Sequence, residues 1–291
     1  MIARMSGWEF REGYVVAPVL EVIVAEQCNL TCASCSHLSP IAQKGFANRT
    51  RLATSLERLR RVFRCEVVKL IGGEPLLHPD LEGVVETVRA AGIGSAVHLV
   101  TNGLLFGPRR RAPKNIDQIT VSTYPSAPLP DLARAELDRA ARAGCRVMHQ
   151  HMSAFQMSHS GRSCDDPALI QVVYDRCKIA HQWCCFTLRE DRFFKCPQAY
   201  SLPLWLGRGE LGTLEDNGLR IDDPGTDDAH LKTALLRYLG SPNPLPACRG
   251  CYGSAGKTFS HHMTSRRDWR SAGATPYEAG LDAEALEEQL P

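Results

Sequence analysis

Three cysteines within eight residues constrain this chain more than any other feature. Cys28, Cys32 and Cys35 have the spacing C-x3-C-x2-C. An apolar run at residues 15–24 predicts a buried strand that leads into them, and the Asn, Ser and Thr residues around them favour a turn. Three thiolates this close point into one small space, which suits a soft metal centre. Zinc normally takes four protein ligands, so three cysteines without a local fourth fit a [4Fe–4S] cluster with one open iron.

Composition excludes several classes of protein. The chain has 291 residues, a net charge of +2 and twelve cysteines. The balanced charge predicts no nucleic-acid partner, and no stretch approaches the roughly 18–20 apolar residues of a membrane span. Many cysteines would suit a secreted disulfide protein if the chain were short and began with a signal peptide, but residues 1–8 hold no such apolar segment. We therefore expect a cytoplasmic protein with reduced thiols, some of which bind metal.

The order of predicted elements indicates the fold class. Hydrophobic periodicity predicts strands at residues 15–24, 66–71, 96–100, 116–122 and 146–149, and helices at 52–63, 79–91 and 129–143. Strands that alternate with helices at this spacing predict an α/β fold with a parallel sheet and right-handed crossovers. Five or six such units are too few for a complete eight-stranded barrel.

A second motif, Gly72-Gly73-Glu74-Pro75, follows the second predicted strand. In open α/β sheets, ligands bind at the carboxyl ends of the strands, where a glycine pair lets the backbone approach a ligand closely. The Glu74 carboxylate can accept hydrogen bonds from an ammonium donor. The alternative is a plain turn with an acid that leads into a helix. Asn102 and Ser122 also end predicted strands, as ligand contacts or as ordinary turn residues.

Together, the two motifs resemble the radical S-adenosylmethionine (SAM) superfamily. The resemblance implies a partial (β/α)6 barrel at residues 15–155, whose open iron is chelated by the amino and carboxylate groups of SAM. It also implies that one electron from the cluster cleaves SAM to methionine and a 5′-deoxyadenosyl radical.

The same resemblance implies roles for single residues. Gly72, Gly73 and Glu74 are expected to contact the amino group of the SAM methionine, and Asn102 and Ser122 are candidates for holding SAM, including its ribose. The family usually has an aromatic residue just before the third cysteine, where this chain has Ser34. That departure leaves open what packs against the adenine.

A second cysteine set lies in the other half of the chain. It comprises Cys177, Cys196 and the C-x2-C pair Cys248 and Cys251. Residues 186–195 predict a hairpin that delivers Cys196 beside Cys177. Four cysteines from three chain segments imply one tertiary site, and C-x2-C suits tetrahedral thiolate ligation.

This second set resembles the twitch (half-SPASM) extension of radical SAM enzymes. The resemblance implies an auxiliary [4Fe–4S] cluster in a small subdomain at residues 156–260, followed by a polar tail at 261–291 with a short helix near 283–289. Asp191 stands where a glycine is usual in the hairpin. Cys184 or Cys185 could replace Cys177 as a ligand, and a structural zinc site is the alternative to the cluster.

Candidate catalytic residues are the thiols and histidines outside these motifs. Cys164, Cys184 and Cys185 are spare thiols that could donate a hydrogen atom to the substrate, while Cys65 and Cys145 are expected in the core. A further group is predicted at strand ends that face the mouth of the barrel, where it could bind hydroxyls or take a proton: His37, His149, Gln150 and His151. Each of these histidines could equally be an ordinary polar residue whose hydrogen bonds are made within the fold.

The resemblance leaves the reaction open. An auxiliary cluster can accept a second electron, which favours oxidation of an alcohol to a ketone over epimerisation or dehydration. The short lead-in before the first strand favours a small molecule over a peptide. Residues 36–40 and 188–196 resemble radical SAM proteins that tailor sugars and aminocyclitols, which implies a sugar- or aminocyclitol-like metabolite of natural-product biosynthesis. The resemblance also implies a flavodoxin or ferredoxin as electron donor. The alternatives are a peptide-modifying maturase and a binding protein that is stabilised by a structural zinc site and has no redox chemistry.

Overall fold

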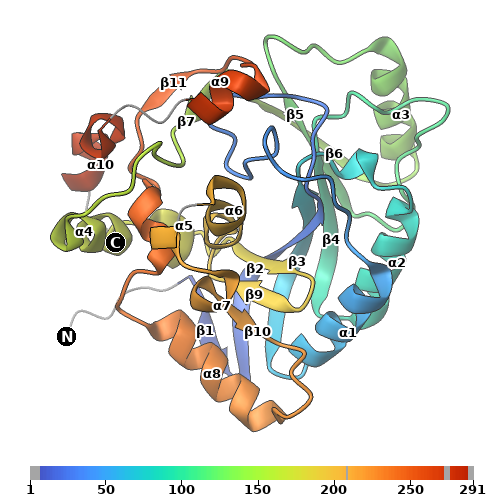
Figure 1. The fold of residues 1–291 in the computed structure, drawn as a ribbon. Helices are drawn as coiled ribbons and strands as arrows, with labels where there is room; N and C mark the ends of the chain where they lie inside the picture. Colours follow the sequence, from blue (N-terminus) through green and yellow to red (C-terminus); the bar gives the residue numbers. More distant parts are fainter. Residues whose placement is uncertain (1–6, 208, 272–275, 288–291) are drawn as a thin grey trace.

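The protein is built around a curved, mainly parallel sheet (Figure 1). The computed structural model describes residues 7–207, 209–271 and 276–287. The parallel strands are β2 (Tyr14–Ala25), β3 (Phe63–Gly72), β4 (Gly94–Thr101), β5 (Gln118–Thr123), β6 (Arg146–His151) and β8 (Phe186–Arg189). Strand order is β10-β9-β8-β2-β3-β4-β5-β6, with β1 (Glu9–Arg11) paired antiparallel to β2. The prediction of an α/β fold with a partial barrel is confirmed.

One edge of the sheet differs from the prediction. Strands β8, β9 (Arg192–Phe194) and β10 (Gly218–Arg220) belong to the main sheet, because β8 pairs in parallel with β2. The predicted hairpin forms between β8 and β9. Its left-handed turn residue is Glu190, with φ 53°, and not Asp191. The domain boundary near residue 155 stays a prediction.

Helices cover the outer face of the sheet. They are α1 (Arg49–Leu59), α2 (Leu81–Ala91), α3 (Asp131–Arg142) and α8 (Asp228–Gly240). The Asn48 side chain caps α1, and Gly92 ends α2 in the left-handed conformation with φ 60°. The helix predicted at 52–63 stops at Leu59, because the chain turns there and Phe63 begins β3.

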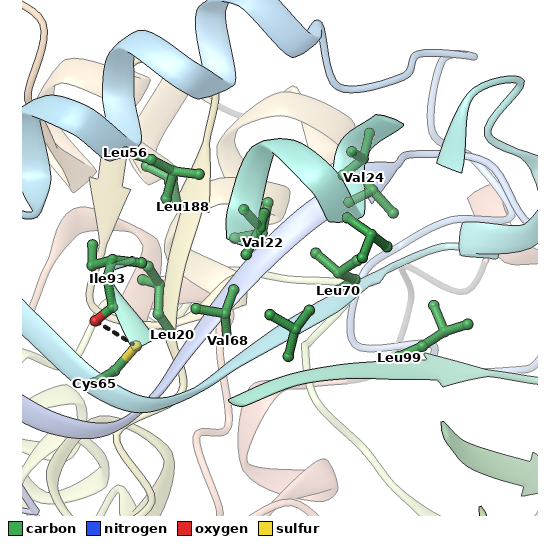
Figure 2. Packing of buried hydrophobic residues seen from close by; sticks show 14 of the residues in the cluster. Leu20, Val22, Val24, Leu56, Cys65, Val68, Leu70, Ile93, Leu99 and Leu188 are labelled. Carbon is green, nitrogen blue, oxygen red and sulfur yellow. Dashed lines mark hydrogen bonds between the residues drawn. The ribbon is translucent and has the colours of Figure 1, made fainter. Parts of the chain in front are cut away.

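The main core lies between these helices and the sheet (Figure 2). Leu20 and Val22 of β2 pack with Leu70 of β3 and Leu56 of α1, all at most 2 % exposed. The Cys65 thiol donates to the Ile93 carbonyl at 3.7 Å inside this core, as expected for a structural cysteine.

Most of the remaining elements lie on the open side of the sheet (Figure 1). The remaining elements are β7 (Ala154–Gln156), β11 (Thr258–Ser260), α4 (Pro167–Asp175), α5 (Lys178–His181), α6 (Pro197–Leu206), α7 (Leu214–Asn217), α9 (Arg266–Ser271), α10 (Ala283–Glu287), η1 (Pro75–Leu77), η2 (Gly209–Leu211), η3 (Pro246–Gly250) and η4 (Tyr277–Gly280). The predicted tail at 261–291 contains α9, η4 and α10; residues 272–275 and 288–291, including the end of the helix predicted at 283–289, lie outside the described residues. None of the helices in the described ranges has the length and apolar character needed to cross a bilayer.

The two faces of the sheet differ in burial. In β3 and β4, the residues that face the helices are fully buried, whereas most of those between them are only half-buried. We call the half-buried side the concave face, since the sheet curves away from α1, α2 and α3 (Figure 1). Glu21 lies on this face in the middle of β2 and is only 6 % exposed. Burial raises the pKa of Glu21 to about 7, against a smaller lowering by the nearby Lys69.

We expect the Glu21→Gln variant to be more stable than the wild type at pH 8 and equally stable near pH 4. A carboxyl whose pKa is raised on folding binds its proton more tightly in the folded state, so wild-type stability falls as pH rises from about 4.5 to about 7. The difference should reach about 3 kcal/mol and stay constant at higher pH. Urea unfolding of both proteins across this pH range measures it, and a difference independent of pH would contradict it.

Candidate metal centres

The cysteine triplet sits on a loop at the carboxyl end of β2. Cys32 is buried, and Cys28 and Cys35 are half-buried. Burial, with a smaller contribution from the neighbouring thiols, raises the pKa of both Cys28 and Cys32 to about 12. The thiols are therefore neutral by themselves, and a cationic metal centre would supply the charge that ionises them.

The glycine pair docks the end of β3 onto the chain that enters this loop. The Gly73 amide donates to the Ala25 carbonyl at 2.7 Å, and the Glu74 amide donates to the Gln27 carbonyl at 2.9 Å. A Cβ added to Gly73 would lie 2.2 Å from the Gln27 oxygen. The close approach expected of this pair is thus made here to another backbone segment.

Glu74 is a buried clamp between strand ends. Its carboxylate, on a residue 1 % exposed, accepts from Thr101 Oγ1 at 2.5 Å, the Leu76 amide at 2.9 Å and the Asn102 amide at 2.8 Å. Burial raises its pKa to about 6. A carboxylate has about four acceptor sites, so one remains for an ammonium donor.

Asn102 connects the end of β4 to the cysteine loop. Its Nδ2 donates to Asn29 Oδ1 at 2.8 Å and lies 3.7 Å from Cys28 Sγ. Ser122 of β5 is at the same level of the sheet, one residue beyond Val121, which pairs with Thr101. The predicted SAM-contacting residues therefore gather around the cysteine loop from three neighbouring strand ends.

Tyr124 is a neighbour of the cysteines that the sequence analysis did not identify. Burial and the three thiols Cys28, Cys32 and Cys35 raise its pKa, so the phenol lies within electrostatic range of all of them. Its ring centroid is 4.7 Å from that of His261. The sequence feature that could have identified Tyr124 is an aromatic residue two positions after Ser122, which ends a predicted strand.

The C-terminal segment closes over the cysteine loop. The Ala33 amide donates to the His262 carbonyl at 3.0 Å, and Trp269 Nε1 donates to the Cys32 carbonyl at 3.0 Å. Ala33 and Ser34 also border a cavity of about 820 Å³, together with Trp205 and other residues of the C-terminal half. The loop thus has the sheet on one side and residues 262–269 on another.

The second cysteine set converges as expected. The four thiols line one cavity of about 30 Å³, from the residue before α5, the residue before α6, and η3 with the residue after it: Cys177, Cys196, Cys248 and Cys251. Cys184 and Cys185 do not line this cavity. Among the described residues, no group of three His, Cys, Asp or Glu side chains lies close enough together to hold a single metal ion.

A buried cation accompanies these four thiols. Lys195 is 1 % exposed, donates to the Tyr174 hydroxyl at 2.7 Å and lies within electrostatic range of Cys177 and Cys248. Four cysteines around one cavity, with a cation beside them, fit an iron–sulfur cluster, whose ligating thiolates are negative.

The spare thiols separate into core and concave-face residues. Cys164 and Cys184 are at most 2 % exposed and pack inside hydrophobic clusters, so neither is placed to reach a substrate. Cys185 is half-buried and lies within electrostatic range of Glu21 and Lys69. Of the three, Cys185 is the one that remains a candidate to reach a substrate, and its role stays a prediction.

The predicted histidines are not gathered at the mouth. His149 pairs with Val121, whose side chain packs in the core under the helices, so His149 and His151 point away from the concave face. Gln150 shares the concave face with Ser122. His37 lies beside Cys35, and burial lowers its pKa to about 4, which leaves a neutral and weakly basic imidazole at neutral pH.

We expect Gly73→Ala to disrupt the cysteine loop. Its Cβ would collide with the Gln27 carbonyl, so the end of β3 must separate from the loop entry, at a cost of roughly 1–3 kcal/mol. Urea unfolding and iron content after anaerobic reconstitution measure the effect. Gly240→Ala is the matched control, since its Cβ meets open space. Equal stability and iron content in both variants would contradict the docking role.

Sequence comparisons identify relatives over part of the chain. No family model matches. The chain is 32% identical to the GTP 3′,8-cyclase of Aquifex aeolicus over 113 residues, which are 36% of this chain and 35% of that protein. It is 32% identical to the Streptomyces coelicolor enzyme of the same name over 114 residues, 37% of this chain and 33% of that enzyme. The chain thus spans about a third of the length of these curated relatives.

Solved structures share the general arrangement at low identity. BtrN in complex with AdoMet and 2-DOIA gives a TM-score of 0.49 with 18% identity, over 80% of this chain and 92% of that one. Streptococcus suis SuiB bound to S-adenosylmethionine gives 0.38 with 10% identity, over 79% of this chain and 65% of that one. The sequence relatives and the cysteine triplet at the carboxyl end of β2 confirm the predicted resemblance to the radical SAM superfamily.

Proposed function

We propose that this protein is a radical SAM enzyme that abstracts a hydrogen atom from a small polar metabolite. The observation that carries the proposal is the gathering of Gly73, Glu74 and Asn102 around the loop that bears the cysteine triplet. Cys28, Cys32 and Cys35 would hold the [4Fe–4S] cluster. When bound, this cluster supplies the electron that cleaves SAM, and an auxiliary cluster accepts one electron from the substrate.

The chain's own residues bind and shield SAM. The acceptor site that remains on Glu74 suits the SAM ammonium, and Asn102 and Ser122 are the proposed contacts of its ribose. Tyr124 offers the aromatic surface that Ser34 lacks. His262 and Trp269 hold the cysteine loop closed from the C-terminal side, which keeps bulk water away from it.

We favour oxidation of an alcohol to a ketone. In this reaction the carbinol carbon would give a hydrogen atom to the 5′-deoxyadenosyl radical and the hydroxyl would give a proton to a base. An auxiliary cluster, when bound, would accept the remaining electron. Cys177, Cys196, Cys248 and Cys251 would hold that auxiliary cluster, with Lys195 beside it.

Epimerisation is the second candidate, and one observation favours it. The half-buried Cys185 thiol on the concave face could return a hydrogen atom to the substrate carbon. The remaining alternatives are a dehydration reaction, a peptide substrate, and a protein that is stabilised by structural zinc and has no redox chemistry. A flavodoxin- or ferredoxin-type protein is the proposed electron donor.

Reconstituted, reduced wild-type protein should convert SAM to 5′-deoxyadenosine, detected by chromatography. The Cys28/Cys32/Cys35→Ala triple variant should form none, because no site for the initiating cluster remains. Cys145→Ala, a thiol outside both sets, should match the wild type. Absence of 5′-deoxyadenosine from fully loaded wild type would overturn the proposal.

Iron analysis of the same proteins tests the auxiliary site. Two [4Fe–4S] clusters predict about eight irons in the wild type and about four in the triple variant. A Cys248→Ala/Cys251→Ala variant should also hold about four. If the wild type instead holds about four irons and the triple variant none, the second site binds zinc or nothing, and the argument for oxidation fails.

A further inference from the structure

A row of polar side chains crosses the concave face far below the strand ends. Its members are paired residues on neighbouring strands and are, in order from β8 to β5, Thr187, Glu21, Lys69, His98 and Gln118. We call these five residues the polar row. Paired residues point to the same side of a sheet, so the five side chains share one face.

Burial identifies that face as the concave one. The residues next to the polar row in sequence, such as Leu20, Val68 and Leu99, are completely or almost completely buried under the helices. Lys69 and His98 are only half-buried, as expected for side chains that line an open interior. The polar row therefore belongs to the inside of the partial barrel.

Glu21 and Lys69 have binding capacity that the protein does not use. Among the described residues, no donor lies within hydrogen-bonding distance of the Glu21 carboxylate, although the residue is only 6 % exposed. Lys69 and His98 likewise form no hydrogen bond or ion pair with any described residue. Burying a carboxylate here without a hydrogen-bond donor costs stability, and such groups are typical of binding sites.

The polar row lies at a definite depth below the SAM level. Lys69, His98 and Gln118 each precede by four positions the residue proposed to contact SAM on the same chain segment. Four strand residues span about 13 Å. Between the two levels, Ile71 and Val100 present apolar surface. A ligand that reaches from one level to the other needs a ring-sized apolar body and polar groups at its far end.

We infer that the polar row is the far wall of the substrate site and that it selects a substrate with an amino group among hydroxyls. Glu21 receives the ammonium, while Lys69, His98 and Gln118 bind hydroxyls. This inference rests on the proposed function, whose substrate class it narrows. An anionic substrate fits less well. Lys69 would attract it, but the Glu21 carboxylate beside Lys69 would repel its negative charge.

Three cyclohexane ligands of matched shape test the inference: 4-aminocyclohexanol, cyclohexane-1,4-diol and 4-hydroxycyclohexanecarboxylate. Calorimetric titration uses reconstituted protein with SAM at pH 8, where Glu21 is ionised. We expect the amine to bind at least about tenfold more tightly than the diol or the acid, as one charge-assisted hydrogen bond allows. Glu21→Gln should abolish the preference for the amine, and Glu21→Asp should retain part of it.

Two control variants locate the effect. Glu66→Gln, an exposed carboxylate on β3, should keep the wild-type preference. Trp205→Ala changes the cavity of about 820 Å³ beside the cysteine loop and should also leave the preference intact. Equal affinity for all three ligands, no binding, a preference that survives in Glu21→Gln, or one lost only in Trp205→Ala would each overturn the inference.

The failure of this inference is distinguishable from the failure of the proposed function. Formation of 5′-deoxyadenosine by the wild type without added ligand tests the function alone. If that reaction occurs and the amine is not preferred, only the substrate class is wrong. If SAM is not cleaved, the function is wrong whatever binds to the polar row.

Discussion

The buried Glu74 carboxylate is the interaction on which the candidate site depends. It accepts from a side chain and a backbone amide at the end of β4, while its own amide donates to the chain that enters the cysteine loop. Two strand ends and the loop therefore hold their relative positions through one residue. A buried carboxylate that lost these donors would be strongly destabilising, so the sheet and the loop form one cooperative unit. Gly73 makes this possible, since any larger residue would separate the two backbones.

The two buried glutamates illustrate different uses of the same side chain. Glu74 accepts three hydrogen bonds from its own chain, whereas Glu21 has no donor among the described residues. Both carry a raised pKa, because burial disfavours their charge. The difference in hydrogen bonding, and not the pKa, separates a carboxylate that fixes strand ends and keeps one acceptor site from one whose acceptor sites are all available to a ligand. A site that binds an external group commonly costs stability in this way.

Local patterns in the sequence predicted what depends on local physics. The alternation of strands and helices, the stop at Gly92 and the hairpin before Cys196 all follow from periodicity and turn chemistry. Three further features depend on pairing between distant segments, which such patterns do not encode. They are the addition of β8 to the edge of β2, the orientation of His149 away from the concave face, and the polar row itself. In the sequence Glu21 is a single acid within an apolar run, and only the register places Lys69 beside it.

The C-terminal cover of the cysteine loop has a consequence for biosynthesis. The backbone of Ala33 and Cys32 finds its partners in His262 and Trp269, which are translated long after the triplet. During synthesis the cysteines leave the ribosome well before the residues that enclose them. The nascent chain therefore presents an open, metal-accessible loop for most of its elongation and closes it only at the end. Iron–sulfur delivery to this loop is thus possible throughout translation, and enclosure by residues 262–269 marks its completion.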